Sequence, residues 1–209
     1  MEKRATKIAG IYAVTQPRAD LEEAVAAVLR GGVQVVQYRD KGEDGARRRA
    51  EAEALRRLCE EHGALFLVND DIELAAAVTA HGVHLGREDP GVGRARQRLG
   101  EAAWIGVSCY DDLERAQRLV QEGADYVAFG SIYPSPTKPE STLAPKELLT
   151  RAGEVTGRPT VAIGGITESN LAEVAAAGAD AAAVVSALFS VEDPEAAARR
   201  LVAEWHRSP

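Results

Sequence analysis

The chain has 209 residues, of which 45% are hydrophobic and 27% charged, and its formal net charge is −7. This composition is typical of a globular protein of one domain, and the negative balance argues against unspecific binding to nucleic acid, which requires a basic surface. With only Cys59 and Cys109, and no Cys-x-x-Cys pattern, neither a disulfide framework nor a zinc site is expected.

The beginning of the sequence bears on the cellular location. Residues 1–7, "MEKRATK", are charged, and no apolar segment of signal-peptide or membrane-spanning length follows. We therefore expect a cytoplasmic protein without a membrane partner. The oligomeric state stays open, and a homo-oligomer is compatible with the sequence.

Eight short apolar runs recur along the chain, at residues 8–15, 33–39, 64–69, 82–86, 103–108, 125–130, 160–165 and 181–186. They are continuous rather than alternating, which is typical of parallel strands buried on both faces. Segments with helical spacing lie between most of them, such as 21–32, 46–63 and 169–179. This alternation predicts a single (β/α)8 TIM barrel over residues 1–209. An open, doubly wound sheet is the alternative, but "AVTQPRADLEEA" after the first strand lacks the Gly-rich fingerprint of that fold.

Polar residues collect at the carboxyl ends of the predicted strands, which meet at one mouth in such a barrel. In "QYRDK", the residues Gln37, Arg39 and Lys41 alternate, so their side chains point to the same space. Arg and Lys are suited to bind phosphate. The alternative is that these two cations are solvated or pair with Asp40 and Glu43.

Two acidic clusters follow neighbouring strands. Asp70 ends the third strand ("VNDD"), and Asp89 comes 19 residues later, after the fourth ("GVHLGRED"). Neighbouring parallel strands are roughly 4.8 Å apart, so both carboxylates can reach one ion, and hard oxygen ligands suit Mg²⁺. The alternative is that Asp70 caps the next helix and Asp89 a turn, although Asp71 is the better cap because it directly precedes the helical pattern.

The longest non-helical stretch is "GSIYPSPTKPESTLAP" (130–145). Its prolines stiffen it, and Ser135, Thr137 and Lys138 offer two hydroxyls and an ammonium group. Long loops in compact domains are usually functional, and a mobile surface loop is the alternative.

Gly164 and Gly165 follow the seventh strand, and Ser186 follows the eighth and begins the last loop. Barrels of this class often bind phosphate through backbone N–H groups after these two strands. Glycines at this position would let the backbone approach an anion.

Together these motifs resemble the thiamine-phosphate synthase family. The matching stretches are "QYRDK", "VNDD" with "GVHLGRED", "IGVSCYD", "YVAFGSIYPSPTK", "VAIGGI" and "AVVSAL", in register over nearly the whole chain. The resemblance implies a transferase that couples 4-amino-2-methyl-5-hydroxymethylpyrimidine diphosphate with a thiazole phosphate, giving thiamine phosphate and pyrophosphate. The chain departs from the family pattern at Arg87, where Gln is usual, and at Ser135, where Thr is usual.

The resemblance also implies the roles of individual residues. It implies Mg²⁺ on Asp70 and Asp89, and catalytic roles for Arg39, Lys41, Ser108 and Lys138, of which the three cations would neutralise the departing diphosphate. Pyrimidine-diphosphate contacts are implied for Gln37, Arg39, Lys41, Asn69, Ser108 and Lys138, and thiazole-phosphate contacts for Ser135, Thr137, Gly165, Val185 and Ser186. Tyr38, Asp40 and Pro136 complete the implied substrate-binding set. The implied mechanism is dissociative and needs no protein nucleophile.

Two alternative functions share this fold or these ligands. A thiazole tautomerase would need a positioned acid or base such as His and no diphosphate clamp. A degenerate, non-catalytic sensor of thiamine phosphates would be favoured by loss of the acidic pair or of Lys138, and the sequence retains both.

Overall fold

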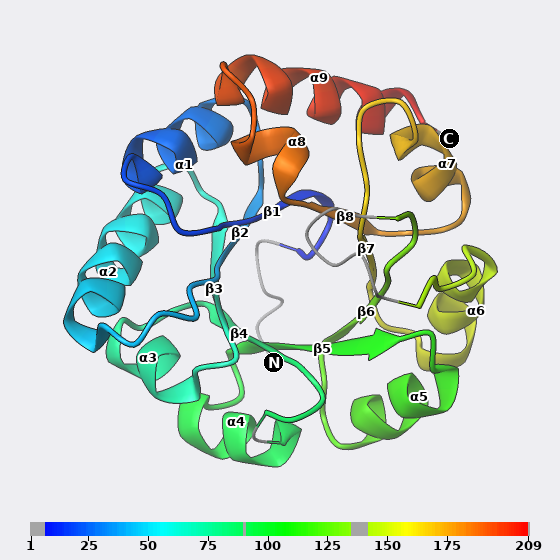
Figure 1. The fold of residues 1–209 in the computed structure, drawn as a ribbon. Helices are drawn as coiled ribbons and strands as arrows, with labels where there is room; N and C mark the ends of the chain where they lie inside the picture. Colours follow the sequence, from blue (N-terminus) through cyan, green and yellow to red (C-terminus); the bar gives the residue numbers. More distant parts are fainter. Residues whose placement is uncertain (1–6, 90, 135–141, 209) are drawn as a thin grey trace.

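The structure is a computed structural model, and it describes residues 7–89, 91–134 and 142–208. Its parallel strands form a closed barrel in which each strand pairs with the next and β8 returns to β1 (Figure 1). In chain order the elements are β1 (Gly10–Val14), α1 (Leu21–Arg30), β2 (Val35–Tyr38), α2 (Gly45–Glu61), β3 (Leu65–Asn69), α3 (Ile72–Ala77), β4 (Gly82–Leu85), α4 (Val92–Leu99), β5 (Trp104–Tyr110), α5 (Leu113–Gln121), β6 (Tyr126–Phe129), α6 (Glu147–Thr156), β7 (Thr160–Ile163), α7 (Leu171–Ala176), β8 (Ala181–Val184), α8 (Ser186–Phe189) and α9 (Pro194–Arg207). The predicted (β/α)8 barrel is confirmed.

Each predicted apolar run overlaps one strand of the barrel. Only β5 extends beyond its predicted run: it was expected to stop at Ser108 and instead continues to Tyr110. Its register against β6 shifts between these two residues, because a bulge inserts an extra residue there.

Strand side chains alternate between two layers of the core. Those that face the helices, such as Ile11, Val36 and Tyr38, belong to one large cluster of buried residues. Those that face the barrel interior, such as Tyr12 and Val35, form a second, smaller cluster. Both faces of the strands are therefore buried, and this explains why their sequences are continuously apolar.

Aspartate side chains define the start of several helices. Asp44, Asp71, Asp112 and Asp193 each accept a hydrogen bond from the backbone N–H three residues later, at the starts of α2, α3, α5 and α9. The prediction that Asp71 caps the helix after β3 is thereby confirmed.

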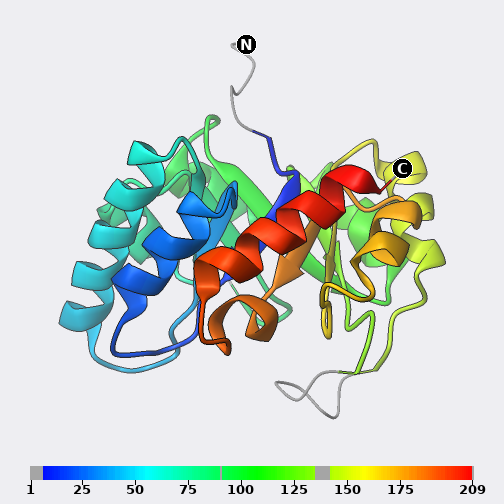
Figure 2. The same cartoon turned by 90° about the horizontal axis from the view of Figure 1, so that it is seen from above.

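The last two helices follow β8 directly. Ser186, expected to begin a loop, instead begins the short helix α8. On the outside of the barrel, α9 lies between α1 and α7 (Figures 1 and 2). Among the described residues, no helix combines the length and apolar character that a membrane crossing requires.

Candidate active site

A cavity of about 410 Å³ opens where the carboxyl ends of the strands converge. Its described lining includes eight residues singled out in the sequence: Gln37, Arg39, Asn69, Ser108, Gly164, Gly165, Val185 and Ser186. The barrel therefore brings together polar groups from β2, β3, β5 and the segments after β7 and β8.

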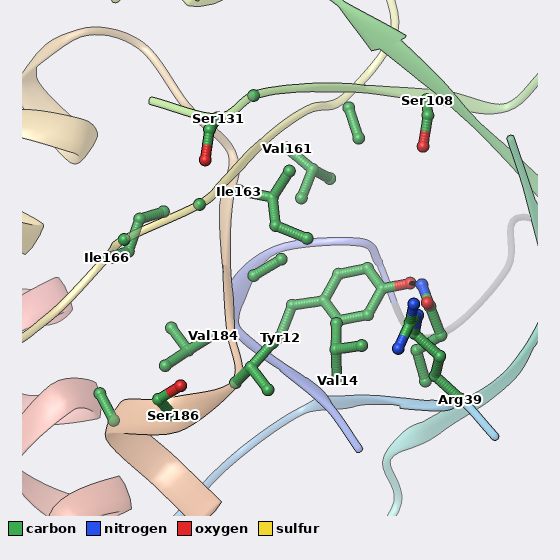
Figure 3. A pocket seen from close by; sticks show the side chains of 18 of the residues that line it. Tyr12, Val14, Arg39, Ser108, Ser131, Val161, Ile163, Ile166, Val184 and Ser186 are labelled. Atoms are coloured by element: carbon green, nitrogen blue, oxygen red, sulfur yellow. Dashed lines mark hydrogen bonds between the residues drawn. The ribbon is translucent and has the colours of Figure 1, made fainter. Parts of the chain in front are cut away.

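Polar side chains occupy two separate sides of this cavity. Figure 3 shows Arg39 and Ser108 on one side and Ser131 and Ser186 on the other. Apolar groups, among them Ile163 and the ring of Tyr12, lie between them. This arrangement provides two polar subsites joined by an apolar wall.

The alternation predicted in "QYRDK" is found for the residues that line the cavity. Gln37 is buried in the barrel, and its side-chain amide donates a hydrogen bond of 2.7 Å to the Tyr12 hydroxyl. Arg39 also lines the cavity, and its backbone N–H donates to the Thr15 hydroxyl at 2.9 Å. Thr15 was not singled out in the sequence, although it ends the first apolar run.

The side chains of Tyr38 and Asp40 do not join this site, because strand alternation turns them toward α2. The Tyr38 hydroxyl donates to Glu51 at 2.7 Å, and burial together with this carboxylate raises the pKa of Tyr38. Asp40 pairs with Arg47 at 2.7 Å and accepts the N–H of Gly42 at 2.6 Å. The hydrogen bond from Arg47 lowers the pKa of Asp40. Both side chains hold the loop after β2 in place.

The acidic residues after β3 and β4 come together as their spacing predicted. The carboxyl groups of Asp70 and Asp89 are close enough to interact directly, and Lys41 Nζ lies 3.5 Å from Asp70 Oδ2. Burial and the neighbouring Asp89 carboxylate raise the pKa of Asp70 to about 6, while Lys41 partly offsets this effect. Asp89 Oδ2 also accepts the backbone N–H of Gly86 at 2.5 Å. Lys41 thus pairs with Asp70, not with the acids of its own loop.

The donor chemistry at this acidic pair fits a magnesium ion. Mg²⁺ is commonly held by one or two carboxylates, with waters and substrate phosphates as its other ligands. In the described part of the chain, no three His, Cys, Asp or Glu side chains gather into a cage. Asp70 and Asp89 therefore suit a metal ion that is shared with a phosphate group.

Ser108 is connected to a buried polar network that the sequence patterns did not reveal. Its hydroxyl lies 2.9 Å from His84 Nε2, and His84 Nδ1 lies 2.9 Å from the hydroxyl of Tyr126. His84 is buried, and it also lines the cavity. The available signal was the inward position of these residues on the consecutive strands β4, β5 and β6.

Two arginines lie beside the acidic pair. Arg115 of α5 donates to the backbone carbonyls of Ser108 at 2.9 Å and Gly86 at 3.1 Å, and so it joins the ends of β4 and β5. The guanidinium of Arg87 lies over the ring of Tyr110, 4.5 Å from its centroid. Arg87 is not among the described residues that line the main cavity, whereas Tyr110 is.

Gly164 and Gly165 are required by close packing of the backbone. Both have positive φ angles, +103° and +62°. A Cβ atom on Gly164 would collide with Ser131, and one on Gly165 would lie 2.8 Å from the Tyr133 carbonyl and even closer to that of Pro134. The glycines thus let the segment after β7 approach the segment after β6, at the edge of the cavity.

Four residues expected in the site, Ser135, Pro136, Thr137 and Lys138, lie outside the described residues. Ser131 lines the cavity, and its carbonyl accepts the N–H of Ala144 at 2.8 Å.

A (β/α)8 barrel whose mouth combines basic groups, a carboxylate pair and a Gly-Gly turn defines a phosphate-handling barrel enzyme. The family model described as thiamine monophosphate synthase matches residues 11–188. The chain is 76% identical to the thiamine-phosphate synthase of Halorhodospira halophila, over 100% of both chains. It is 52% identical to that of Thioalkalivibrio sulfidiphilus, covering 97% of this chain and 98% of the relative.

The solved structure of a thiamine phosphate pyrophosphorylase from Pyrococcus furiosus is also similar. It matches with a TM-score of 0.88 and 33% identity, over 97% of this chain and 98% of the other. The chain belongs to the thiamine-phosphate synthase family. This confirms the family, the transferase class and the thiamine-phosphate-forming reaction expected from the sequence.

Proposed function

We propose that the chain joins the two substrates within the one cavity, each held on its own polar side. The pyrimidine diphosphate occupies the side lined by Gln37, Arg39, Asn69 and Ser108. The thiazole phosphate occupies the side lined by Gly165, Val185 and Ser186. The observation that carries this proposal is the separation of the two polar sides by an apolar wall (Figure 3), which suits two flat rings with a phosphate at each far end.

The diphosphate lies next to the acidic pair in this arrangement. Mg²⁺ held by Asp70 and Asp89 would supply positive charge to the diphosphate oxygens and make the diphosphate a better leaving group. Lys41, already 3.5 Å from Asp70, and Arg39 at the cavity wall add two cations on the same side. These preorganised charges stabilise the negative charge that develops as the diphosphate leaves.

The reaction exchanges one bond for another at the pyrimidine methylene carbon. The C–O bond to the diphosphate breaks, and its electron pair leaves with the oxygen as pyrophosphate. The methylene carbon carries positive charge until the lone pair of the thiazole nitrogen forms the new C–N bond. The residues named here bind and orient the two rings so that nitrogen and carbon face each other.

A covalent enzyme intermediate is not part of this mechanism. Neither cysteine is among the described residues that line the cavity. Both are buried, and burial raises the pKa of each thiol to about 12, so neither supplies a thiolate at neutral pH.

The proposal extends to residues outside the described part of the chain. Lys138 is assigned to the departing diphosphate, and Ser135, Pro136 and Thr137 to the thiazole phosphate, because their motif matches the family pattern. The proposal also includes a cytoplasmic location for the protein.

A coupling assay with the purified chain tests the function. Both substrates and Mg²⁺ are supplied, and thiamine phosphate and pyrophosphate are measured with and without EDTA. Equal amounts of the two products, formed only when the metal is available, are expected. Tight binding of either substrate without turnover would instead indicate a sensor.

Thiazole tautomerisation is a second candidate, because His84 lies in the cavity. However, both of its ring nitrogens are within hydrogen-bond distance of hydroxyl groups, those of Tyr126 and Ser108. Proton transfer to a ligand would have to break one of these bonds. Isomerisation of the thiazole phosphate alone, without coupling, would favour this candidate.

A further inference from the structure

An unbroken series of hydrogen bonds crosses the floor of the cavity from β2 to β5. Gln37 Nε2 lies 2.7 Å from the Tyr12 hydroxyl, which lies 3.0 Å from that of Tyr126. The Tyr126 hydroxyl lies 2.9 Å from His84 Nδ1, and His84 Nε2 lies 2.9 Å from Ser108 Oγ. The two ends, Gln37 and Ser108, both line the cavity, where the pyrimidine is proposed to bind.

The two tyrosines in the middle of this network are held firmly by packing. Tyr12 is 1% exposed and Tyr126 is fully buried, and their rings meet edge to face with centroids 6.3 Å apart. Gly106 of β5 leaves the space in which the Tyr126 ring lies, because a Cβ atom there would overlap that ring. Two hydroxyl groups inside an otherwise apolar core are costly unless they form hydrogen bonds, and here each one has two partners.

The donors and acceptors of the network form a directed series. The amide N–H of Gln37 donates to Tyr12. With that direction at one end, the geometry allows a series in which the Tyr12 O–H donates to Tyr126 and the Tyr126 O–H donates to His84 Nδ1. In this series His84 Nδ1 is an acceptor, and the tautomer that fits has the ring proton on Nε2, from which it is donated to Ser108. Burial raises the pKa of Tyr12 to about 12 and that of Tyr126 well above 10, so both hydroxyls keep their protons.

We propose that Tyr12 and Tyr126 are positioning residues that set which hydrogen-bonding groups the cavity presents to the pyrimidine. Because Gln37 uses its N–H to reach Tyr12, its carbonyl oxygen is left to accept. Because Ser108 accepts from His84, its hydroxyl hydrogen is left to donate. One acceptor and one donor match a ring that carries an amino group and a ring nitrogen, as an aminopyrimidine does. This inference rests on the proposed function for the identity of the ligand.

Removal of one tyrosine hydroxyl should disturb both ends of the network. In Tyr126→Phe the ring still fills its space, but His84 Nδ1 loses its donor, and the proton is no longer held on Nε2. We expect kcat/KM for the pyrimidine diphosphate to fall roughly ten- to a hundredfold, as the loss of one or two aligned hydrogen bonds predicts. The KM for the thiazole phosphate should stay within about twofold, since that subsite lies on the other side of the cavity.

The matched control is Tyr133→Phe. It removes a tyrosine hydroxyl whose partner is Glu173 at the protein surface, 3.0 Å away. We expect this variant to retain the wild-type kinetics. The double variant Tyr12→Phe/Tyr126→Phe should have a kcat/KM only slightly lower than that of either single variant. Loss of one hydroxyl already interrupts the series, so the second substitution adds little.

The spectroscopic test does not depend on turnover. ¹⁵N NMR of the ligand-free protein should show His84 as a single tautomer with the proton on Nε2, and Tyr126→Phe and Tyr12→Phe should both shift this equilibrium. An unchanged His84 tautomer in both variants, or wild-type kcat/KM in both, would overturn the inference. If the wild-type chain shows the expected tautomer but forms no thiamine phosphate, the proposed function fails, and with it the ligand named here.

Discussion

The carboxyl group of Asp70, which follows β3, lies close enough to that of Asp89, which follows β4, for the two to interact directly. The contact arises because β3 and β4 are neighbours in register, with Asn69 opposite His84. Asp70 adopts a left-handed backbone conformation, with φ of 63°, at this point. Placing two acidic groups together, partly buried, costs folding free energy, and the raised pKa of Asp70 measures that cost.

Asp70→Asn should lower the activity of the protein without lowering its stability. The pKa of Asp70 is raised to about 6 in the folded protein, whereas its ordinary value, expected in the unfolded chain, is 3.8. The carboxyl group therefore ionises more easily in the unfolded chain. Stability therefore falls as the pH rises between these values, and the full penalty is present above pH 6. Without Mg²⁺ at pH 8, the variant should unfold at the same or a higher temperature than wild type. The two unfolding temperatures should converge near pH 4. Its turnover should fall by roughly a hundredfold or more.

Thermal unfolding with and without Mg²⁺ provides the measurement. Wild type should be stabilised by the ion, and Asp70→Asn should not respond. Asn also tolerates the left-handed conformation, so the backbone is preserved. Asp71→Asn is the control, since Asp71 caps α3 and pairs with Arg48 at 3.0 Å. It should lower stability but keep the response to Mg²⁺. An equal Mg²⁺ response in wild type and Asp70→Asn would remove the metal assignment.

Arg39→Gln should impair diphosphate departure. The guanidinium of Arg39 lines the cavity on the side proposed for the pyrimidine diphosphate. Loss of one preorganised cation should lower kcat/KM for this substrate by roughly 10²- to 10³-fold, comparable to the loss of an oxyanion donor. Steady-state kinetics with the pyrimidine diphosphate varied would measure the effect.

The same substitution at Arg87 is the control for Arg39. Arg87 lies over the Tyr110 ring, outside the described lining of the main cavity. Arg87→Gln should therefore change kcat/KM by less than about threefold and cost about 0.5–1 kcal/mol of stability through the lost cation–π contact. Equal losses in the two variants would show that the cavity does not discriminate between the two positions, and the assignment of Arg39 would be wrong.

The elements that the sequence predicted well are those set by local pattern. Continuous apolar runs marked every strand, and strand order in a (β/α)8 barrel follows chain order. The meeting of Asp70 and Asp89 followed from that order alone, because both lie at the ends of neighbouring strands.

The relationships that the sequence did not predict depend on packing between distant strands. Tyr12 and Tyr126 are 114 positions apart, and only barrel closure brings their hydroxyls together. A family-like motif can also contain residues whose side chains lie on opposite faces of one strand. Tyr38 and Asp40 sit within "QYRDK", yet their side chains contact Glu51 and Arg47 on the helix side.

Asp40→Asn should destabilise the protein in a pH-dependent way. The Arg47 hydrogen bond holds the pKa of Asp40 below its ordinary value of 3.8. This interaction therefore contributes its full stability above about pH 4 and is lost as the pH falls through the lowered pKa. We expect a loss of about 1–2 kcal/mol at pH 7, since Arg47 is partly exposed and Asn still accepts the Gly42 N–H. Urea unfolding at pH 7 and pH 3 should show the difference between wild type and variant shrinking at the lower pH. A constant difference would mean that the charge of Asp40 is not the cause.

Gly165→Ala should damage the thiazole-phosphate side of the cavity. Gly165 has φ of +62°, and a Cβ atom there would collide with the carbonyl oxygens of Tyr133 and Pro134, which belong to the backbone and cannot rotate away. Gly157→Ala is a matched control, because Gly157 has nearly the same φ, +60°, and nothing lies within 4 Å of its added Cβ. Both variants should lose about 1–2 kcal/mol from the left-handed conformation alone. Gly165→Ala should lose further stability and raise the KM for the thiazole phosphate several-fold, while Gly157→Ala should leave that KM unchanged. Unfolding curves and kinetics with the thiazole phosphate varied would decide, and matching results for the two variants would show that the close approach after β7 plays no part in phosphate binding.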